Sequence, residues 1–345
     1  MKTITVTASQ NYQVRIGAGL ISHLGEQLLQ VLQKPCNTVI ISDSNVFPLY
    51  GERVTKSLEK AGFQVLSYVF PAGEASKNAG EYLNILNFLA EHHISRADAV
   101  LALGGGVTGD MTGFAAATYL RGIPYIQIPT TLLAMVDSSV GGKTAIDLPA
   151  GKNLVGAFYQ PRLVLCDLDF LNTLPERVFC DGCAEVIKYG VLYDEKLFAH
   201  LSEYGLAFDR EAVISRCVEL KRDVVAEDEF DTGARQKLNL GHTIGHGIEA
   251  QSQFTITHGQ AVAIGMAIVA KAGCKAIYEP LKAVLTKFNL PTTTDFTAQQ
   301  LYLSALSDKK RAGDTVNLII PNTIGDCRIA PTPVDQLKSF IEEGL

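Results

Sequence analysis

The sequence has little of what marks several common protein classes. Its 30 Lys and Arg residues against 36 Asp and Glu residues leave a formal net charge of −6, so no basic surplus is available to neutralise nucleic-acid phosphates. The longest strongly apolar stretch, residues 261–270, is about half of the ~20 residues that a membrane-spanning helix needs. We therefore expect no nucleic-acid partner and no membrane insertion. The negative net charge remains compatible with binding of an anionic small molecule, because a few local cations suffice to bind it.

Cysteine is also sparse and irregularly placed. The seven cysteines form an odd and mostly scattered set, which is unlike the paired framework of a disulfide-stapled secreted domain. Residues 1–7 contain no apolar run of the kind found in a secretory signal, so we expect none. Internal repeats and low-complexity tracts are absent. A reduced, cytoplasmic protein is the expectation.

What the sequence does contain is a change of pattern near its middle. With 345 residues and 47% hydrophobic residues, the chain is long enough for about two domains of ~150 residues. Before residue 170, short β-branched runs alternate with apolar residues at helical spacing, which is typical of a parallel sheet with crossover helices. Later segments are mostly helical. We expect an α/β fold with a Rossmann-like nucleotide-binding domain over 1–165 and a mainly helical metal- and substrate-binding domain over 166–345.

The boundaries of the expected elements follow from these runs. The predicted strands are 3–7, 12–16, 38–42, 64–70, 97–103, 125–128, 163–166 and 315–320. The predicted helices are 20–32, 46–61, 79–92, 181–204, 210–227, 241–251, 259–278 and 298–306.

A glycine-rich turn, residues 104–110, follows one of the apolar strands and opens a helix. It fits G-x-G-x-x-G, in which glycines let backbone N–H groups approach a pyrophosphate at a helix N-terminus. In a standard Rossmann fold the motif follows the first strand and an acid lies ~20 residues later, whereas here position 124 is proline. Asp43, at the end of an earlier strand, is the acid that could hold a ribose. A tight structural turn is the alternative explanation.

Two further glycine turns carry lysines. Gly-Gly-Lys-Thr at 141–144 resembles the end of a P-loop, but Asp137 stands where that motif needs its first glycine, so we reject a Walker A site. Lys143, Lys152 and Asn153 would suit binding of a phosphate or carboxylate. Solvated turn residues would have the same composition, and the residues alone do not separate the two interpretations.

Three of the seven histidines fall in one short segment and indicate a metal site. His242 and His246 are four residues apart and share a helix face, and His258 begins the next helical run. With Glu185 they offer imidazoles and a carboxylate, a donor set typical of a catalytic zinc site with an open position. Thr243 stands where a zincin would have its glutamate, so that class is excluded.

Other polar residues have weaker patterns. Cys180 and Cys183 form a CxxC just before Glu185; coincidence is the favoured explanation of this spacing, with competition for the metal as the alternative. Lys188 lies one helical turn after Glu185, where an ordinary ion pair is expected. Lys221, Arg235 and Asn239 flank an acidic stretch, and residues 308–311 are charged in the manner of a surface loop.

Taken together, the motifs resemble those of the sugar phosphate cyclases, and among them the 3-dehydroquinate synthase family, over nearly the whole chain. The segments that carry the resemblance are 104–110, 129–134, 136–144, 151–153, 184–189 and 241–246. Gln260 departs from the family by replacing a glutamate that is common after His-Gly, and Cys183 replaces an aliphatic residue. Asn153 and Asn239 match the dehydroquinate type rather than the relatives that form deoxy-inosose or valiolone rings.

The resemblance implies a role for each motif residue. One divalent metal, zinc or cobalt, would be held by Glu185, His242 and His258, with His246 as a nearby non-ligand that binds or deprotonates substrate. NAD would contact Asp43, Asn45, Glu74, Lys77, Gly105, Gly106, Val107, Thr108, Gly109, Asp110, Thr130, Thr131, Asp137, Lys143, Lys152, Phe170, Leu171, Asn172 and Thr173. Substrate phosphate and carboxylate would meet Arg121, Lys143, Asn153, Lys188, Lys221, Arg235, Asn239 and one of Lys309 or Lys310. In relatives the residue matching Arg121 crosses a dimer interface, so a homodimer is implied.

The implied reaction converts 3-deoxy-D-arabino-heptulosonate 7-phosphate to 3-dehydroquinate and phosphate in the shikimate pathway of aromatic amino-acid biosynthesis. NAD would oxidise an alcohol transiently, because a C–H bond beside a ketone is acidic enough for phosphate elimination. Re-reduction and an intramolecular aldol addition would follow, so that NAD is regenerated. Two other classes remain: a metal-dependent polyol dehydrogenase, which would release NADH, and a catalytically silent binding protein, which an intact set of metal ligands disfavours.

Overall fold

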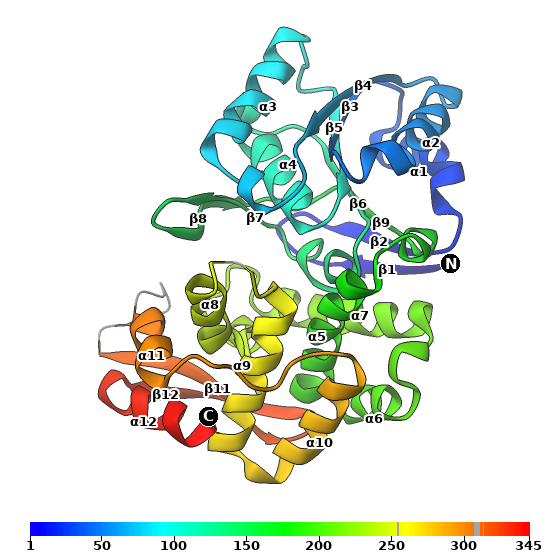
Figure 1. The fold of residues 1–345 in the computed structure, drawn as a ribbon. Coiled ribbons are helices and arrows are strands. Elements are labelled where there is room, and N and C mark those ends of the chain that lie inside the picture. The colour runs from blue at the N-terminus through cyan, green and yellow to red at the C-terminus, as the bar shows by residue number, and fades with distance from the viewer. Residues whose placement is uncertain (254, 307–310, 313) are drawn as a thin grey trace. The chain divides into compact units, whose positions relative to one another are not determined.

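The computed structural model describes residues 1–253, 255–306, 311–312 and 314–345, and these divide into two compact units (Figure 1). Unit 1 comprises Met1–Leu174 and Lys221–Phe230, and unit 2 comprises Pro175–Leu220 and Asp231–Leu345. Among the described residues, none of the helices combines the length and apolar character required to span a bilayer.

Unit 1 is built on a seven-stranded sheet with the order β1-β2-β9-β6-β5-β3-β4. Its neighbouring strands are parallel, as the sequence predicted, except that β1 and β2 form an antiparallel pair. Every residue of β5, β6 and β9 is buried, which explains why their sequences are continuous apolar runs. The strands are β1 (Lys2–Val6), β2 (Tyr12–Gly17), β3 (Asn37–Asp43), β4 (Gln64–Phe70), β5 (Ala99–Gly104), β6 (Tyr125–Pro129) and β9 (Leu163–Asp167).

Four helices of unit 1 pack on this sheet, and α4 is the most deeply buried of them. It follows β5 directly, so that the glycine turn joins the two. A Cβ atom added at Gly113 would lie 2.4 Å from Thr144 Cγ2 and 3.0 Å from the Tyr125 ring, and glycine therefore lets α4 approach its neighbours. The helices are α1 (Leu24–Leu32), α2 (Phe47–Lys60), α3 (Ala79–Glu91) and α4 (Gly106–Thr118).

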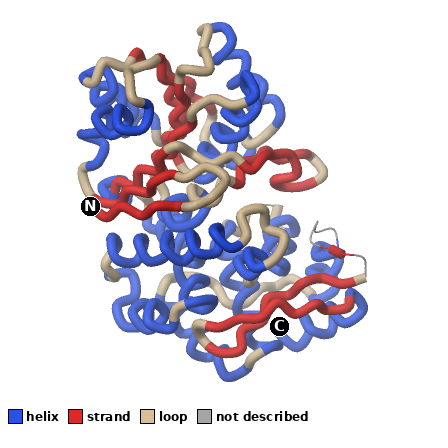
Figure 2. Tube along the Cα trace, turned by 180° about the vertical axis from the view of Figure 1, so that it is seen from behind, coloured by secondary structure: helices blue, strands red, loops and turns tan. Residues whose placement is uncertain are grey.

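A hairpin that the sequence analysis missed extends from unit 1. Its strands, β7 (Lys143–Leu148) and β8 (Gly151–Phe158), pair with each other in a two-stranded sheet, and Asp147 of β7 forms one isolated bridge to Asn78 (Figures 1 and 2). Most of β8 is exposed, so it lacks the strong apolar pattern by which a buried strand is predicted. The lysine-bearing glycine turns thus lie within and between two paired strands.

Unit 2 is mainly helical, as predicted, but it also contains a small sheet. The antiparallel order is β10-β11-β12, of which only β11 was expected (Figure 2). The helices are α5 (Glu176–Tyr193), α6 (Glu195–Tyr204), α8 (His242–Gln251), α9 (His258–Gly273), α10 (Lys275–Lys287), α11 (Ala298–Leu306) and α12 (Val334–Gly344), while α7 (Arg210–Glu227) has residues in both units. The strands are β10 (Arg311–Ala312), β11 (Thr315–Thr323) and β12 (Asp326–Pro333).

Two predicted helices of unit 2 are each two helices in the structure. The pattern over 181–204 is interrupted at Asp194, whose backbone is extended and whose side chain accepts a hydrogen bond from the Leu197 amide at the start of α6. The pattern over 259–278 is interrupted at Cys274, which is also non-helical. Apolar spacing continues across both breaks, and so it did not reveal them.

Candidate active site

Three side chains of unit 2 converge on one point: Glu185 from α5, His242 from α8 and His258 from α9. The His242 and His258 Nε2 atoms lie 3.4 and 3.3 Å from the same Glu185 oxygen, Oε1. One ligand atom from each residue falls within 4.8 Å of the others. The structure therefore brings together all three predicted metal ligands in a geometry that one divalent ion could occupy.

The segment before α8 sets the position of His242. Residues Ala234–Asn239 form a 3-10 helix that ends at Leu240, and Gly241 then adopts a left-handed φ of 77°. The Leu240 carbonyl accepts a hydrogen bond from His242 Nδ1 at 3.0 Å. This bond places the proton on Nδ1 and leaves the Nε2 lone pair facing Glu185.

Contacts between α5 and α9 set the position of His258. Asp181, one turn before Glu185, accepts hydrogen bonds from the Thr257 hydroxyl and, at 3.2 Å, from the Gln260 amide. Thr257 and Gln260 also form a capping box at the start of α9. Gln260 therefore fulfils the capping role that a glutamate would have, and its departure from the family pattern leaves the helix start intact.

His258 contacts a second carboxylate as well. Its Nδ1 lies 3.3 Å from Glu249 Oε2 on α8, and Glu249 is only 3% exposed. Burial lowers the pKa of His258, but hydrogen bonds to Glu185 and Glu249 outweigh burial and raise it to about 10. The sequence analysis missed Glu249. Its spacing of seven from His242 and three from His246, on one helix face, was the available signal.

The remaining predicted residues of unit 2 lie in or near this group. The His246 ring is 5.4 Å from that of His242 and 6.3 Å from that of His258, centroid to centroid. Lys188 is 1% exposed and forms an ion pair with Glu185 Oε2. Its position one helical turn after Glu185 predicted this ion pair. Arg235 is buried and Asn239 half-buried on the 3-10 helix that leads to α8.

Unit 1 gathers the predicted nucleotide-binding residues at the carboxyl ends of adjacent strands. Asp43 ends β3, the glycine turn follows β5, and these two strands are parallel neighbours. The Thr108 hydroxyl donates to Asp43 Oδ2 at 3.4 Å, and the Thr130 amide donates to the Gly104 carbonyl at 2.9 Å. Ligands of open α/β sheets bind at such an edge.

Two details of this edge suit a phosphate-bearing ligand. α4 begins at Gly106, so its unpaired N-terminal amides lie in the glycine turn. The Thr130 hydroxyl is buried and has no hydrogen-bond partner among the described residues. Of the other predicted contacts, Asn45 is exposed, Val107 and Thr131 are half-buried, and Gly109 is buried.

Lys77 links several predicted residues. Its Nζ donates to Asp110 Oδ2 and to Asn153 Oδ1, both at 2.6 Å, although Lys77 is only 5% exposed. Burial lowers the pKa of Lys77, but Asp110 and Glu74 raise it by more. Burial raises the pKa of Asp110 and Lys77 opposes that rise. Nearby, Lys152 Nζ lies 3.5 Å from Glu74 Oε1.

Other predicted residues are held by separate contacts. Lys221 is buried and donates to both the carbonyl and Oδ1 of Asp137, at 2.7 and 2.8 Å. Lys143 is exposed at the start of β7. Arg121 is exposed with a left-handed φ of 67°. Lys309 and Lys310 lie outside the described residues.

The segment Phe170–Thr173 lies in and just after a 3-10 helix, Leu168–Asn172, that follows β9. The Phe170 ring packs against Tyr50 with centroids 4.5 Å apart, and the Thr173 hydroxyl is hydrogen-bonded to that of Tyr50. Phe170 and Leu171 are buried, whereas Asn172 and Thr173 are exposed.

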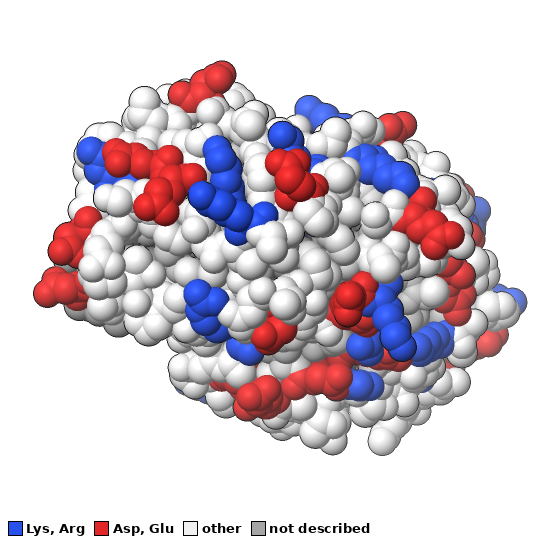
Figure 3. Space-filling view, turned by 90° about the horizontal axis from the view of Figure 1, so that it is seen from below, with Lys and Arg blue, Asp and Glu red and all other residues white. Residues whose placement is uncertain are grey.

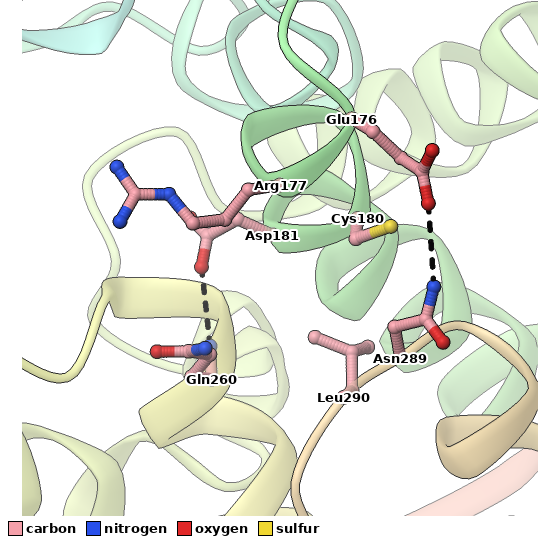
Figure 4. A pocket seen from close by; sticks show the side chains of 7 residues that line it. All are labelled: Glu176, Arg177, Cys180, Asp181, Gln260, Asn289 and Leu290. Atoms are coloured by element: carbon pink, nitrogen blue, oxygen red, sulfur yellow. Dashed lines mark hydrogen bonds between the residues drawn. The ribbon is translucent and has the colours of Figure 1, made fainter.

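A pocket elsewhere in unit 2 contains Cys180 (Figure 4). It lies between α5, the start of α9 and the segment after α10, and Asn289 there donates to Glu176 Oε1 at 3.5 Å. Burial raises the pKa of both Cys180 and Cys183, which keeps these thiols protonated. Among the described residues, the groups with metal-ligand geometry include neither cysteine.

On the face drawn in Figure 3, acidic and basic side chains are interspersed.

Comparisons with known proteins agree with this arrangement. The N-terminal and C-terminal models of 3-dehydroquinate synthase match residues 67–181 and 182–311. A 3-dehydroquinate synthase of Clostridium acetobutylicum is 44% identical over 95% of this chain and 96% of its own length. A crystal structure of 2-deoxy-scyllo-inosose synthase complexed with carbaglucose-6-phosphate, NAD+ and Co2+ is 26% identical, with a TM-score of 0.87 over the full length of both chains.

The fold extends to a wider group. A glycerol dehydrogenase from Schizosaccharomyces pombe has a TM-score of 0.63 over 99% of this chain and 92% of its own, at 18% identity. The chain thus has the fold that the cyclase and the dehydrogenase share, here an α/β unit followed by a mainly helical unit. Among proteins of this fold, the chain belongs to the 3-dehydroquinate synthase family.

Proposed function

We propose that this protein is a carbocycle-forming phosphate lyase that converts 3-deoxy-D-arabino-heptulosonate 7-phosphate to 3-dehydroquinate and phosphate, with NAD and one divalent metal ion as cofactors. The observation that carries the proposal is the convergence of Glu185, His242 and His258 in a chain of the 3-dehydroquinate synthase family. This reaction belongs to the shikimate pathway, and a cytoplasmic location is part of the proposal.

The proposed metal ligands are Glu185, His242 and His258, because one anionic oxygen and two Nε2 atoms face a common point. This donor set fits zinc or cobalt. When bound, the ion supplies Lewis-acid polarisation of a carbon–oxygen bond of the substrate. Lys188 keeps its ammonium beside Glu185 and so provides a counter-charge for that buried carboxylate.

The proposed NAD contacts are the residues at the carboxyl ends of β3, β5 and β6 together with the Lys77 network. NAD supplies reversible acceptance of a hydride when bound. Amides at the start of α4 and the buried Thr130 hydroxyl would bind the pyrophosphate, and Asp43 would accept a hydrogen bond from a ribose hydroxyl. The proposal also assigns nucleotide binding to residues 1–165 and binding of the metal and the substrate to residues 166–345.

The proposed substrate contacts are cations and amides suited to a phosphate and a carboxylate. Arg235 and Lys188 provide buried positive charge, and Asn239, on the same 3-10 helix as Arg235, provides a neutral hydrogen-bonding group. His246 is placed to hold or move a proton of a substrate hydroxyl. The full set comprises Arg121, Lys143, Asn153, Lys188, Lys221, Arg235, Asn239 and His246.

A homodimer completes the proposal. Its support in the structure is the exposed apolar surface of unit 1: Leu154, Val155 and Phe158 of β8 are 37–42% exposed, and Leu120, next to Arg121, is 39% exposed. Apolar side chains gathered on a protruding hairpin are typical of a surface that a second chain covers.

The function is tested by measuring phosphate release from 3-deoxy-D-arabino-heptulosonate 7-phosphate. The concentration of NAD is kept far below that of the substrate. We expect many phosphates per NAD, no accumulation of NADH, and loss of activity on addition of a chelator. Replenishment with Zn2+ should restore the rate.

A simple polyol in place of the sugar phosphate is the matched control for this assay. NADH accumulating with the polyol, together with an absence of phosphate release from the sugar phosphate, would replace the cyclase assignment by a dehydrogenase. Phosphate release that needs stoichiometric NAD would likewise contradict a cycle in which NAD is regenerated.

A further inference from the structure

Glu249 is a buried carboxylate of α8 to which the proposed reaction assigns no role. It lies three residues after His246 and seven after His242, and so on the same helix face as both. Burial of a carboxylate is costly unless it is paired or hydrogen-bonded. Its position against His258 therefore suggests a specific interaction rather than chance.

The two nitrogens of His258 face two different carboxylates. Nε2 lies 3.3 Å from Glu185 Oε1, and Nδ1 lies 3.3 Å from Glu249 Oε2. An imidazole that binds a metal through Nε2 must carry its proton on Nδ1, where it needs an acceptor. Glu249 is that acceptor.

The same arrangement occurs at His242, with a different acceptor. There, Nε2 also faces Glu185 Oε1, while Nδ1 donates to the Leu240 carbonyl. Both imidazoles thus have a fixed tautomer, one through a neutral carbonyl and the other through a carboxylate. A carboxylate increases the basicity of an imidazole ligand more than a carbonyl does.

We propose that Glu249 is a positioning residue, which orients His258 and strengthens it as a metal ligand by accepting the Nδ1 proton. The proposal rests on the proposed function in that it takes Glu185, His242 and His258 as the metal-binding group. It adds a residue that acts through His258 and does not touch the ion.

A direct role for Glu249 as a ligand is the geometric alternative. Ligand atoms of His246, Glu249 and His258 also lie within 4.8 Å of one another. However, the two ring nitrogens of an imidazole point in different directions, so His258 cannot direct both toward one ion. Glu185 faces Nε2 of two histidines, whereas Glu249 faces Nδ1 of one, which assigns the ion to Glu185.

The test measures zinc affinity of the full-length protein, freed of metal by dialysis, in competition with a chromophoric chelator. We expect Glu249→Ala to weaken zinc binding by about 10–100-fold at an unchanged stoichiometry of one ion. Glu249→Gln should recover part of that loss, because an amide oxygen still accepts the Nδ1 proton. The visible spectrum of the Co2+ form should shift in the alanine variant.

The matched control is Gln251→Ala, on the same helix, whose exposed side chain donates to Ser304. It should bind zinc as the unchanged protein does. Circular dichroism and NAD affinity, measured on the same samples, establish that each variant is folded. If Glu249→Ala does not fold, the proposal is tested with Glu249→Gln, for which we expect a smaller loss of zinc affinity.

Two results would overturn the proposal. If folded Glu249→Ala keeps the zinc affinity and the Co2+ spectrum of the unchanged protein, Glu249 has no role at the metal. Loss of the bound ion itself, as severe as that caused by Glu185→Gln, would make Glu249 a direct ligand. Zinc titration uses no substrate, so an enzyme that fails to release phosphate would contradict the proposed function without affecting this result.

Discussion

Glu185 is the residue toward which both histidine ligands point. Its carboxylate is 1% exposed and is also paired with Lys188, which is equally buried. We predict that Glu185→Gln weakens metal binding by more than about 100-fold, beyond the range expected for an indirect contact. Turnover should be lost and NAD affinity retained. Metal content after dialysis and NAD binding by titration measure the two effects.

Glu176→Gln is the control for this variant, because Glu176 begins the same helix but is exposed and has only a long contact to Asn289. It should keep both metal and activity. Full activity in Glu185→Gln would remove Glu185 from the ligand set.

Lys77 presents a different case, in which charge stabilises the fold. Its ammonium bonds to Asp110 and Asn153 while almost fully buried. We predict that Lys77→Met lowers the free energy of unfolding by about 3–5 kcal/mol, because it leaves the Asp110 carboxylate without its counter-charge. The chain has no tryptophan, so urea unfolding followed by circular dichroism is the suitable measurement.

The loss in Lys77→Met should depend on pH. Burial already raises the pKa of Asp110, and removal of Lys77 removes an opposing influence, so its pKa rises further. The folded variant then holds a proton that the unfolded chain releases above about pH 4, and stability falls as pH rises from there through the folded pKa. The variant should thus be closer to the unchanged protein at pH 5 than at pH 8.

Lys152→Met provides the comparison. Its 3.5 Å ion pair with Glu74 is partly exposed, unlike the buried Lys77 contacts, and surface pairs contribute less than about 1 kcal/mol. Equal destabilisation by both substitutions, or no dependence on pH in Lys77→Met, would show that the Lys77 contacts do not stabilise unit 1.

The proposed metal ligands come from three helices, and glycines allow these helices to approach closely. A Cβ atom at Gly259, the residue after His258, would lie 1.9 Å from the Asp181 carbonyl oxygen of α5. A Cβ atom at Gly265 would lie 2.0 Å from the Gly241 carbonyl oxygen at the start of α8. Both obstacles are backbone atoms, which cannot move without displacing a helix.

We therefore predict that Gly259→Ala separates α9 from α5 and weakens zinc binding by about 10-fold or more, because His258 moves away from Glu185. Overpacking of this kind typically costs about 1–3 kcal/mol of stability. Zinc titration and urea unfolding are the measurements. Gly247→Ala is the control, since its Cβ would lie 3.1 Å from the Ser304 side chain and 3.6 Å from the Leu301 carbonyl oxygen, an ordinary contact distance. Zinc affinity in Gly259→Ala equal to that of the control would contradict the prediction.

This dependence on close helix approach explains what the sequence could and could not predict. Buried strands such as β5 and β6 were recognisable because nearly all of their residues are apolar, and the proposed ligands Glu185, His242 and His258 because donor residues are rare and clustered. The β7–β8 hairpin was not predicted, because its strands pair with each other outside the seven-stranded sheet and remain exposed. Glu249 was not predicted either: its spacing places it on the helix face of His242 and His246, but its contact with His258 joins two helices and appears only in the structure.

At the level of the whole molecule, the proposed homodimer can be tested through Arg121. Arg121 is exposed and left-handed, next to the half-exposed apolar Leu120, so its guanidinium is available to another molecule. The resemblance to the family assigns this arginine to the substrate of a second subunit. Two inactive variants can test that assignment without knowledge of the interface.

Arg121→Ala and Glu185→Gln should each be inactive as homodimers. When the two chains are refolded together, heterodimers form, and in each of them one site combines the native Glu185 of the first chain with the native Arg121 of the second. Random pairing in a two-fold dimer makes about half of the molecules heterodimers with one working site each, so about a quarter of normal activity should return. Phosphate release measures it, and light scattering establishes the dimer. If Arg121 instead served the site of its own chain, every site in the mixture would lack either Arg121 or Glu185, and no activity would return.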